Sequence, residues 1–193
     1  MVDTSIKDPL LDAEQNIMGT VKVLEAARRN SVQRVIFAST AASYGDVLES
    51  ELPVRESKEL APLSFYGLSK VTVENYLELY HRIYDLDYVV LRFANVYGER
   101  QGDGGEGGVI SIFAKRIAKE QDITIFGDGE QTRDFVYAGD IASGIYAALC
   151  TEQVNAAYNL STQTETSLRE LVNILSNIAG RRIIQTAPGF VGD

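Results

Sequence analysis

Val32-Gln33-Arg34-Val35-Ile36-Phe37-Ala38 is a short and mostly apolar run, typical of a strand that is buried on both faces of a sheet. A helix over residues 8–30 precedes it, because an Asp-Pro start is followed by apolar residues at helical spacing. After a loop over residues 41–63, a second helix is expected from 64 to 84. The sequence therefore predicts a helix, a buried strand and a second helix in succession.

The rest of the chain continues this alternation. Strands are expected at residues 87–94, 123–126, 134–137, 156–160 and 182–186, and helices at residues 109–119, 139–150 and 167–179. A capping box, Ser167-Leu168-Arg169-Glu170, marks the start of the last helix. Buried strands that alternate with helices of this length predict an α/β fold with a parallel, doubly wound sheet.

Composition and charge narrow the classes of partner. The 193 residues carry a formal net charge of −9, whereas a surface for nucleic acid or an anionic membrane requires a basic face. The N-terminus has no apolar signal region and no run approaches a membrane span, so we expect a cytoplasmic protein. The single cysteine, Cys150, excludes an internal disulfide and a cysteine-rich zinc site, and we expect it to be buried in an apolar helix.

Tyr66 and Lys70 lie four residues apart at the start of the second helix, hence on one face of it. A tyrosine is a poor base near neutral pH because its reference pKa is about 10, and a nearby ammonium group favours the phenolate. The pair can therefore act as a proton shuttle for a sugar or alcohol hydroxyl. With ten tyrosines in the chain, about 0.3 such pairs are expected by chance, so a solvated helix face is the alternative interpretation.

The stretch Gly102-Asp103-Gly104-Gly105-Glu106-Gly107 matches the dinucleotide-binding pattern G-x-G-x-x-G. A functional pattern of this kind turns directly off a strand, whereas the preceding strand here ends near Ala94. We interpret the stretch as a mobile loop and its match as coincidence. If the protein uses NAD, the turn that binds the pyrophosphate is then not in this chain.

Four motifs follow one another in a fixed order. They are Phe37-Ala38-Ser39-Thr40-Ala41-Ala42-Ser43-Tyr44-Gly45, Tyr66-x-x-x-Lys70, Leu91-Arg92-Phe93-Ala94-Asn95-Val96-Tyr97-Gly98, and Gly127-Asp128-Gly129-Glu130-Gln131-Thr132-Arg133-Asp134-Phe135-Val136-Tyr137 with Asp140. With these motifs the chain resembles the extended short-chain dehydrogenase/reductase family, and most closely its nucleotide-sugar epimerases of the UDP-glucose 4-epimerase type. The resemblance covers residues 8–186 and implies NAD as cofactor and a UDP-sugar as substrate.

The resemblance implies epimerisation at C4 of UDP-glucose or UDP-galactose through a transient 4-keto sugar. Thr40 would hydrogen-bond the reacting sugar oxygen, and Tyr66, as a phenolate, would take the proton of the C4 hydroxyl while hydride passes to the nicotinamide. Lys70 would lower the pKa of Tyr66 and bind the nicotinamide ribose. Besides Tyr66 and Lys70, the residues implied to contact the cofactor are Asn16, Ser39 and Phe93.

Asn95 and Arg133 match the positions that bind the nucleotide diphosphate, and the planar fork of an arginine suits that task. The positions that wall the uridine and phosphates are matched by Val109, Thr124, Phe126 and Phe135. Other interpretations stay open: Asn95 could cap a turn, Arg133 could pair with Asp134 or Asp140, and the apolar wall residues could be core.

The two residues after Thr40 bear on the reaction subclass. The dehydratases of the family place an Asp-Glu pair there and the decarboxylases keep a Glu, whereas this chain has Ala41 and Ala42, which favours epimerisation. The single histidine, His81, lies roughly 22 Å beyond Tyr66 along the helix axis, so we expect it at a surface or interface. Neither a catalytic triad nor a metal site is expected.

Members of this family begin with about 70 further residues that hold the Gly-rich turn and additional βα units. We therefore expect one truncated domain with a partial Rossmann-like core over residues 1–97 and 134–165. Part of a small C-terminal substrate-binding lobe, interleaved with this core, is expected over residues 98–133 and 166–193. The strand at 32–38 would present an unpaired apolar edge.

Alternative functions stay open. The chain could be a piece of an active epimerase, or a catalytically inactive remnant that self-associates through its exposed edge. A dehydratase or decarboxylase of the same family is a further alternative. The resemblance also implies a homodimer that pairs through helices 8–30 and 64–84.

Overall fold

The computed structural model describes residues 2–102, 108–180 and 184–187 of the chain. The chain divides into two compact units, Met1–Ala94 with Asp140–Leu160 and Asn95–Gly139 with Ser161–Asp193, which we call the first and the second unit. The chain thus passes between the units three times, after residues 94, 139 and 160, and these crossings lie a few residues from the boundaries expected between core and lobe.

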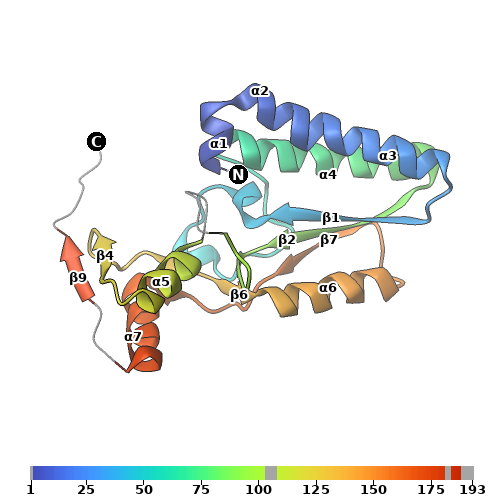
Figure 1. Cartoon of the computed structure of the whole chain (residues 1–193). Coiled ribbons are helices and arrows are strands. Elements are labelled where there is room, and N and C mark those ends of the chain that lie inside the picture. Colours follow the sequence, from blue (N-terminus) through green and yellow to red (C-terminus); the bar gives the residue numbers. More distant parts are fainter. Residues whose placement is uncertain (1, 103–107, 181–183, 188–193) are drawn as a thin grey trace. The chain divides into compact units, whose positions relative to one another are not determined.

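The first unit is built on a parallel sheet of three strands in the order β1-β2-β7 (Figure 1). Strand β1 (Arg34–Thr40) pairs with β2 (Asp87–Phe93), and β2 pairs with β7 (Ala156–Leu160). In this register Arg34 lies opposite Asp87. Among the described residues β1 is an edge of this sheet, which is the position that the sequence predicted for it.

Helices cover both faces of this sheet (Figure 1). The elements on one face are α3 (Gly19–Arg29) and α4 (Phe65–Tyr84), and α6 (Ala138–Cys150) lies on the other. Phe37 and Val90 pack with Leu24 of α3, whereas Val89 of β2 packs with Ala148 of α6. Because neighbouring strand residues point to opposite faces, both faces are buried, and the predicted α/β class is confirmed.

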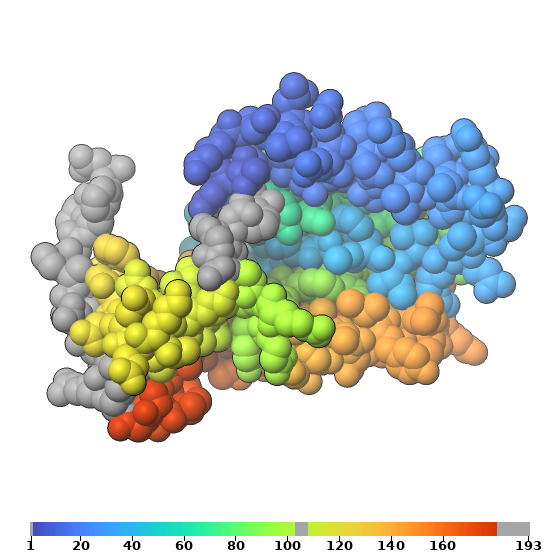
Figure 2. Space-filling view, viewed as in Figure 1, coloured from blue at the N-terminus to red at the C-terminus, as the bar shows by residue number. Residues whose placement is uncertain are grey.

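Three short helical segments lead into α3. They are α1 (Val2–Lys7), α2 (Pro9–Asp12) and the π-helix η1 (Ala13–Met18). Asp8 caps α2 as predicted, because its carboxylate accepts a hydrogen bond from the N–H of Leu11 at 3.0 Å. The hydrophobic spacing showed neither α1 nor the wider π-turn. Figure 2 shows this N-terminal segment, in blue, on the outside of the first unit.

The loop predicted between β1 and α4 contains two 3₁₀-helices, η2 (Ala41–Tyr44) and η3 (Glu49–Glu51). Gly45 ends η2 at φ +68°, and a Cβ there would lie 2.0 Å from the carbonyl oxygen of Ala61. Only a glycine fits this close approach of two backbone segments. The loop therefore leaves the end of β1 along a path that the backbone itself determines.

Short strand pairs and two helices make up the described part of the second unit. Parallel pairs join β3 (Asn95–Tyr97) to β6 (Phe135–Tyr137) and β4 (Ile123–Phe126) to β9 (Ile184–Ala187), and β5 (Thr132–Arg133) is antiparallel to β8 (Thr166–Ser167). Helices α5 (Val109–Ala118) and α7 (Leu168–Ala179) enclose a core that includes Phe113, Ile123 and Val172. The predicted capping box of Ser167 and Glu170 is present.

The expectation that Cys150 is buried is wrong, because the residue is exposed at the end of α6. Helix α6 buries Ile141 and Ala148, and Cys150 lies about 200° around the helix from Ala148 at roughly 100° per residue. The Gly-rich stretch predicted to be a mobile loop includes residues 103–107, which lie outside the described residues. Within the described ranges, no helix has both the length and the apolar character needed to cross a membrane.

Candidate active site

Thr40 and Tyr66 come together at the carboxyl end of β1. Thr40 is the last residue of the strand, and its Oγ1 accepts a hydrogen bond from the N–H of Ala42 at 3.2 Å. The Thr40 hydroxyl also hydrogen-bonds the side chain of Tyr66. Open α/β sheets bind ligands at the carboxyl ends of their strands, so the two hydroxyls lie where a reacting group would be expected.

The first turn of α4 is held from two sides. The Oγ of Ser64 caps the helix by accepting a hydrogen bond from the N–H of Gly67 at 3.1 Å. The N–H of Tyr66 donates to the Oγ of Ser5 at 3.0 Å, and Ser5 is fully buried in α1. Helix α1, which the sequence did not predict, thus anchors the backbone of Tyr66.

Lys70 lies one turn further along α4, on the same side as Tyr66. Its Nζ lies 5.6 Å from the centre of the Tyr66 ring and 4.9 Å from the centre of the Phe37 ring. The ammonium group donates a hydrogen bond to the carbonyl oxygen of Ala38 at 3.0 Å. Burial lowers the pKa of Lys70, and the negative charge of Asp12 opposes that change. Lys70 is thus held between α4 and β1, beside the candidate base.

The pKa of Tyr66 is raised, which corrects the expectation that Lys70 lowers it. Burial is the largest cause, because it disfavours the phenolate, and the charge of Asp12 adds to the rise. The hydrogen bond from Thr40 acts in the opposite direction. Lys70 lies over the Tyr66 ring. In this structure desolvation therefore outweighs the hydrogen bond from Thr40, which favours the charged form.

Asn16 lies in the π-helix, and Asp12 holds its side chain in place. The Nδ2 of Asn16 donates to Oδ1 of Asp12 at 2.7 Å, and Ser69 donates to the other oxygen of Asp12 at 2.6 Å. Asp12 and Ser69 are both buried. The sequence reasoning missed these two residues, although Asp12 lies one helical turn before Asn16 and Ser69 adjoins Lys70.

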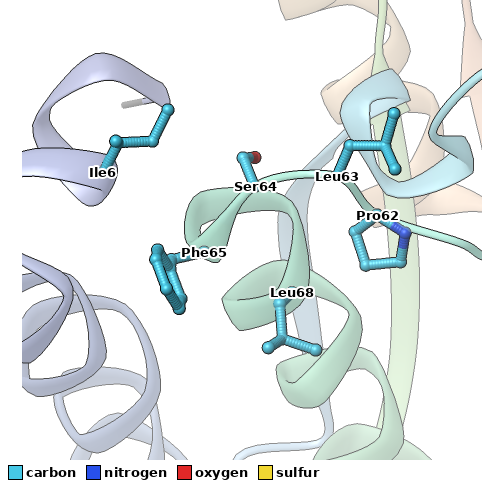
Figure 3. Close-up of a pocket in the computed structure, with 6 residues that line it drawn as sticks. All are labelled: Ile6, Pro62, Leu63, Ser64, Phe65 and Leu68. Atoms are coloured by element: carbon cyan, nitrogen blue, oxygen red, sulfur yellow. The ribbon is translucent and has the colours of Figure 1, made fainter.

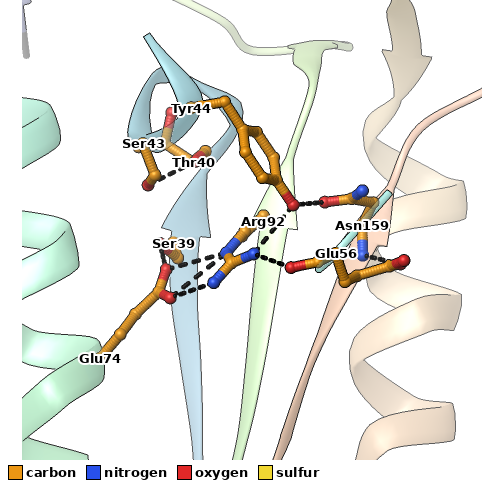
Figure 4. Close-up of polar contacts among 8 residues, drawn as sticks. All are labelled: Ser39, Thr40, Ser43, Tyr44, Glu56, Glu74, Arg92 and Asn159. Carbon is orange, nitrogen blue, oxygen red and sulfur yellow. Dashed lines mark hydrogen bonds and ion pairs between the residues drawn. The ribbon is translucent and has the colours of Figure 1, made fainter. Parts of the chain in front are cut away.

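The resemblance implies that Ser39 contacts the cofactor, but its side chain takes part in a buried hydrogen-bond network. Its Oγ donates to Glu74 of α4 at 2.5 Å, and Glu74 also accepts hydrogen bonds from the guanidinium of Arg92 (Figure 4). Arg92 in turn donates to the hydroxyl of Tyr44 at 2.9 Å. Since Ser39 is only 3% exposed, its hydroxyl belongs to a buried network that ties α4, β2 and η2 together.

Phe93 and His81 mark opposite ends of β2. Phe93 is its last residue and packs against the cluster that contains Leu91 and Ala148. His81 is half-buried, and its Nδ1 lies 3.4 Å from a carboxylate oxygen of Asp87, the first residue of β2. His81 is thus far along the strand from the end where Thr40 and Tyr66 meet.

The residues expected to bind the diphosphate lie in the second unit. Asn95 begins β3, and its N–H donates to the carbonyl oxygen of Asp134 at 2.9 Å. Arg133 is exposed in β5 and donates to the carbonyl oxygen of Thr132 at 2.7 Å. The carboxylate of Asp134 accepts hydrogen bonds from Thr162, among others, so its main contacts are with the segment before β8.

The wall residues differ in exposure. Phe126 is 67% exposed at the end of β4, so the alternative that it belongs to the core is wrong. Val109 and Phe135 are half-buried and pack against the core of the second unit, and Thr124 is half-buried in β4. Phe126 is therefore the apolar wall residue most available to a ligand.

A separate hollow of about 270 Å³ lies beside the first turn of α4 (Figure 3). Its lining residues are Ile6, Pro62, Leu63, Ser64, Phe65 and Leu68. The five side chains other than that of Ser64, which caps the helix, are apolar. The hollow therefore offers no group for acid–base chemistry, in contrast to the end of β1.

Comparison with known families gives a match over most of the chain. Residues 1–161 match the model of the NAD dependent epimerase/dehydratase family. The chain is 38% identical over 180 residues to the UDP-glucose 4-epimerase of Mycolicibacterium smegmatis. These 180 residues are 93% of this chain and 57% of that protein.

Solved structures give the same result. The UDP-N-acetylglucosamine 4-epimerase from Methanobrevibacter ruminantium, in complex with UDP-N-acetylmuramic acid, aligns with a TM-score of 0.93 and 32% identity. The UDP-glucose 4-epimerase of Thermus thermophilus in complex with NAD aligns with a TM-score of 0.87 and 39% identity. Both alignments cover the whole of this chain, but only 62% and 63% of those chains.

Proposed function

Because the chain belongs to the NAD dependent epimerase/dehydratase family, we propose that its protein epimerises C4 of a UDP-hexose, interconverting UDP-glucose and UDP-galactose. The observation that carries this proposal is the hydrogen bond between Thr40 and Tyr66 at the carboxyl end of β1, with Lys70 beside it. The UDP-glucose 4-epimerases among the similar proteins support the substrate class.

In the proposed reaction Tyr66 accepts the proton of the C4 hydroxyl as the C4 hydride leaves, which gives a transient 4-keto sugar. It returns the proton to the same oxygen when the hydride comes back to the other face of C4. Thr40 donates a hydrogen bond either to the Tyr66 oxygen, where it stabilises the phenolate, or to the sugar oxygen, where it stabilises developing negative charge. Tyr66 is half-buried, so its hydroxyl is partly shielded from water. The cost is a raised pKa, which nearby positive charge has to offset.

The residues beside Tyr66 suit the ribose of a nicotinamide dinucleotide. An ammonium group has three donors, and among the described residues Lys70 uses one of them on Ala38. The remaining donors can reach two ribose hydroxyls, and Asn16 lies next to this region through its bond to Asp12. NAD, when bound, supplies a reversible acceptor for the hydride of C4.

For the sugar nucleotide we propose a diphosphate contact from Arg133 with Asn95, and a uridine wall from Val109, Thr124, Phe126 and Phe135. The support is chemical: Arg133 is exposed, and its guanidinium can bind two phosphate oxygens at once. The exposed ring of Phe126 offers a surface on which a base can stack.

Epimerisation is favoured over dehydration by the residues that follow Thr40. Water elimination needs an acid and a base, and Ala41 and Ala42 supply neither. In the structure these alanines begin the 3₁₀-helix η2, whose turn is closed on the Oγ1 of Thr40. Hydride transfer with one proton shuttle needs no further side chain there.

A homodimer that pairs through the helices over residues 8–30 and 64–84 is proposed as well. These helices carry exposed apolar side chains, namely Leu10, Met18, Val23, Leu68, Tyr76, Leu79, Ile83 and Tyr84. Apolar surface of this extent is typical of an interface between proteins. The exposed β1 edge is the competing route to self-association.

The direct test is interconversion of UDP-glucose and UDP-galactose in the presence of NAD. Tyr66→Phe should abolish turnover and leave binding of the nucleotide nearly intact, whereas Tyr146→Phe, an exposed tyrosine on α6, should be fully active. Turnover that survives Tyr66→Phe would show that Tyr66 is not the base. A folded chain that fails to bind NADH in a fluorescence titration would favour the inactive remnant instead.

A further inference from the structure

Asp12 is a buried carboxylate to which the proposed reaction gives no part. It lies at the end of α2, where the chain enters the π-helix η1, and is 6% exposed. Its two oxygens accept hydrogen bonds from different elements, one from Asn16 of η1 at 2.7 Å and one from Ser69 of α4 at 2.6 Å. These bonds connect the residue implied to contact the cofactor with the helix that carries Tyr66.

Two neutral donors do not balance a buried negative charge, which usually needs a cation nearby. Lys70 follows Ser69 directly on α4 and is a cation that the charge of Asp12 influences. The charge of Asp12 raises the pKa of Lys70 against the burial that lowers it, and it also adds to the raised pKa of Tyr66. Asp12 therefore acts on the two residues of the candidate proton shuttle as well as on Asn16.

We propose that Asp12 is a positioning residue of this site, which orients Asn16 with one oxygen, holds Ser69 beside Lys70 with the other, and balances the Lys70 ammonium with its charge. Asp12 acts through these neighbours, and no reacting atom is assigned to it. The π-helix is consistent with this role, because such wide turns are frequent at functional sites. The roles of Asn16, Tyr66 and Lys70 in the reaction rest on the proposed function. The contacts of Asp12 and its effect on Lys70 do not depend on that function.

The experiment compares Asp12→Asn with Ser69→Ala in the full chain. The first removes the charge and keeps the shape, and the second removes a hydrogen bond and keeps the charge. The pKa of Lys70 is read from the ¹³Cε signal of labelled lysine, assigned with Lys70→Met, and that of Tyr66 from phenolate absorbance against Tyr66→Phe. Asp12→Asn should lower the pKa of Lys70 and also that of Tyr66, because the charge of Asp12 raises both, and Ser69→Ala should leave both unchanged.

An unchanged pKa of Lys70 in folded Asp12→Asn overturns the proposal. Asp12→Ser is the second neutral variant, and if neither folds while Ser69→Ala does, Asp12 has a purely structural role and the proposal is also overturned. None of these measurements needs NAD or a sugar nucleotide. A chain without epimerase activity in which the pKa of Lys70 still falls would refute the proposed function alone.

Discussion

Replacing Glu74 with glutamine should destabilise the first unit strongly, because it leaves a buried guanidinium without its counter-charge. Glu74 and Arg92 are 8% and 6% exposed, and three hydrogen bonds join them, the shortest 2.6 Å between Nη2 and Oε2. Burial lowers the pKa of Arg92, but the bonds to Glu74 and Tyr44 outweigh it and raise the pKa. Because an arginine stays protonated in proteins even without such partners, the charge on Arg92 stays in place when Glu74 is neutralised.

The expected loss is about 3–5 kcal/mol of unfolding free energy, which is typical when one partner of a buried ion pair is removed. Against a usual domain stability of about 5–15 kcal/mol, that is a large fraction. In a chain of this size it corresponds to a fall in Tm of about 6–20 °C. Ser39→Ala, which removes one hydrogen bond to Glu74, should cost only about 1 kcal/mol.

Urea unfolding followed by circular dichroism measures these losses, with Glu78→Gln as the matched control. Glu78 lies four residues further along α4, and its contact with Arg82 is exposed and 4.0 Å long, so we expect a loss below about 0.5 kcal/mol. Replacing Glu74 and Arg92 together by methionine should recover much of the stability, because no unpaired charge remains. A Glu74→Gln protein as stable as the Glu78→Gln control would refute the reasoning.

Three further predictions concern the backbone and the pH dependence. Gly45→Ala should lower the unfolding free energy by at least about 3 kcal/mol, because the added Cβ would meet the backbone of Ala61. Gly180→Ala, also at φ +68° but with open space around it, should lower it by about 1 kcal/mol in the same unfolding assay. Equal losses in the two variants would rule out the steric cause. Hydrogen bonds from Arg28 and Tyr80 lower the pKa of Glu25 to about 2, so its stabilising effect is present above pH 4.5 and is lost as the pH falls towards 2. Glu25→Gln should therefore make Tm depend less on pH over that range. An unchanged dependence of Tm on pH would contradict the assignment. Burial raises the pKa of Tyr66, so its stabilising effect is present below pH 10 and is lost as the pH rises further. Difference absorbance against Tyr66→Phe should show the Tyr66 phenolate only above pH 10. A titration midpoint below pH 10 would show that the charge of Lys70 dominates.

The sequence by itself determined the features that depend on near neighbours in the chain. The Asp8 cap, the capping box at Ser167 and the buried strands were all predictable, because caps and periodicity are local properties. The placement of Tyr66 and Lys70 on one face of α4 also follows from their spacing alone. The order of the motifs was enough to indicate the family.

Only the tertiary structure decided which polar groups are used by the fold and which remain for a ligand. Ser39 and Glu74 are 35 residues apart in the chain, and Asp12 and Ser69 are 57 apart, so no local pattern shows these bonds. The pKa of Tyr66 likewise depends on burial by residues from several elements, which outweighs the effect expected from its helix neighbour. Spacing along a helix brings two groups together, but the packing around them sets the charge that each carries.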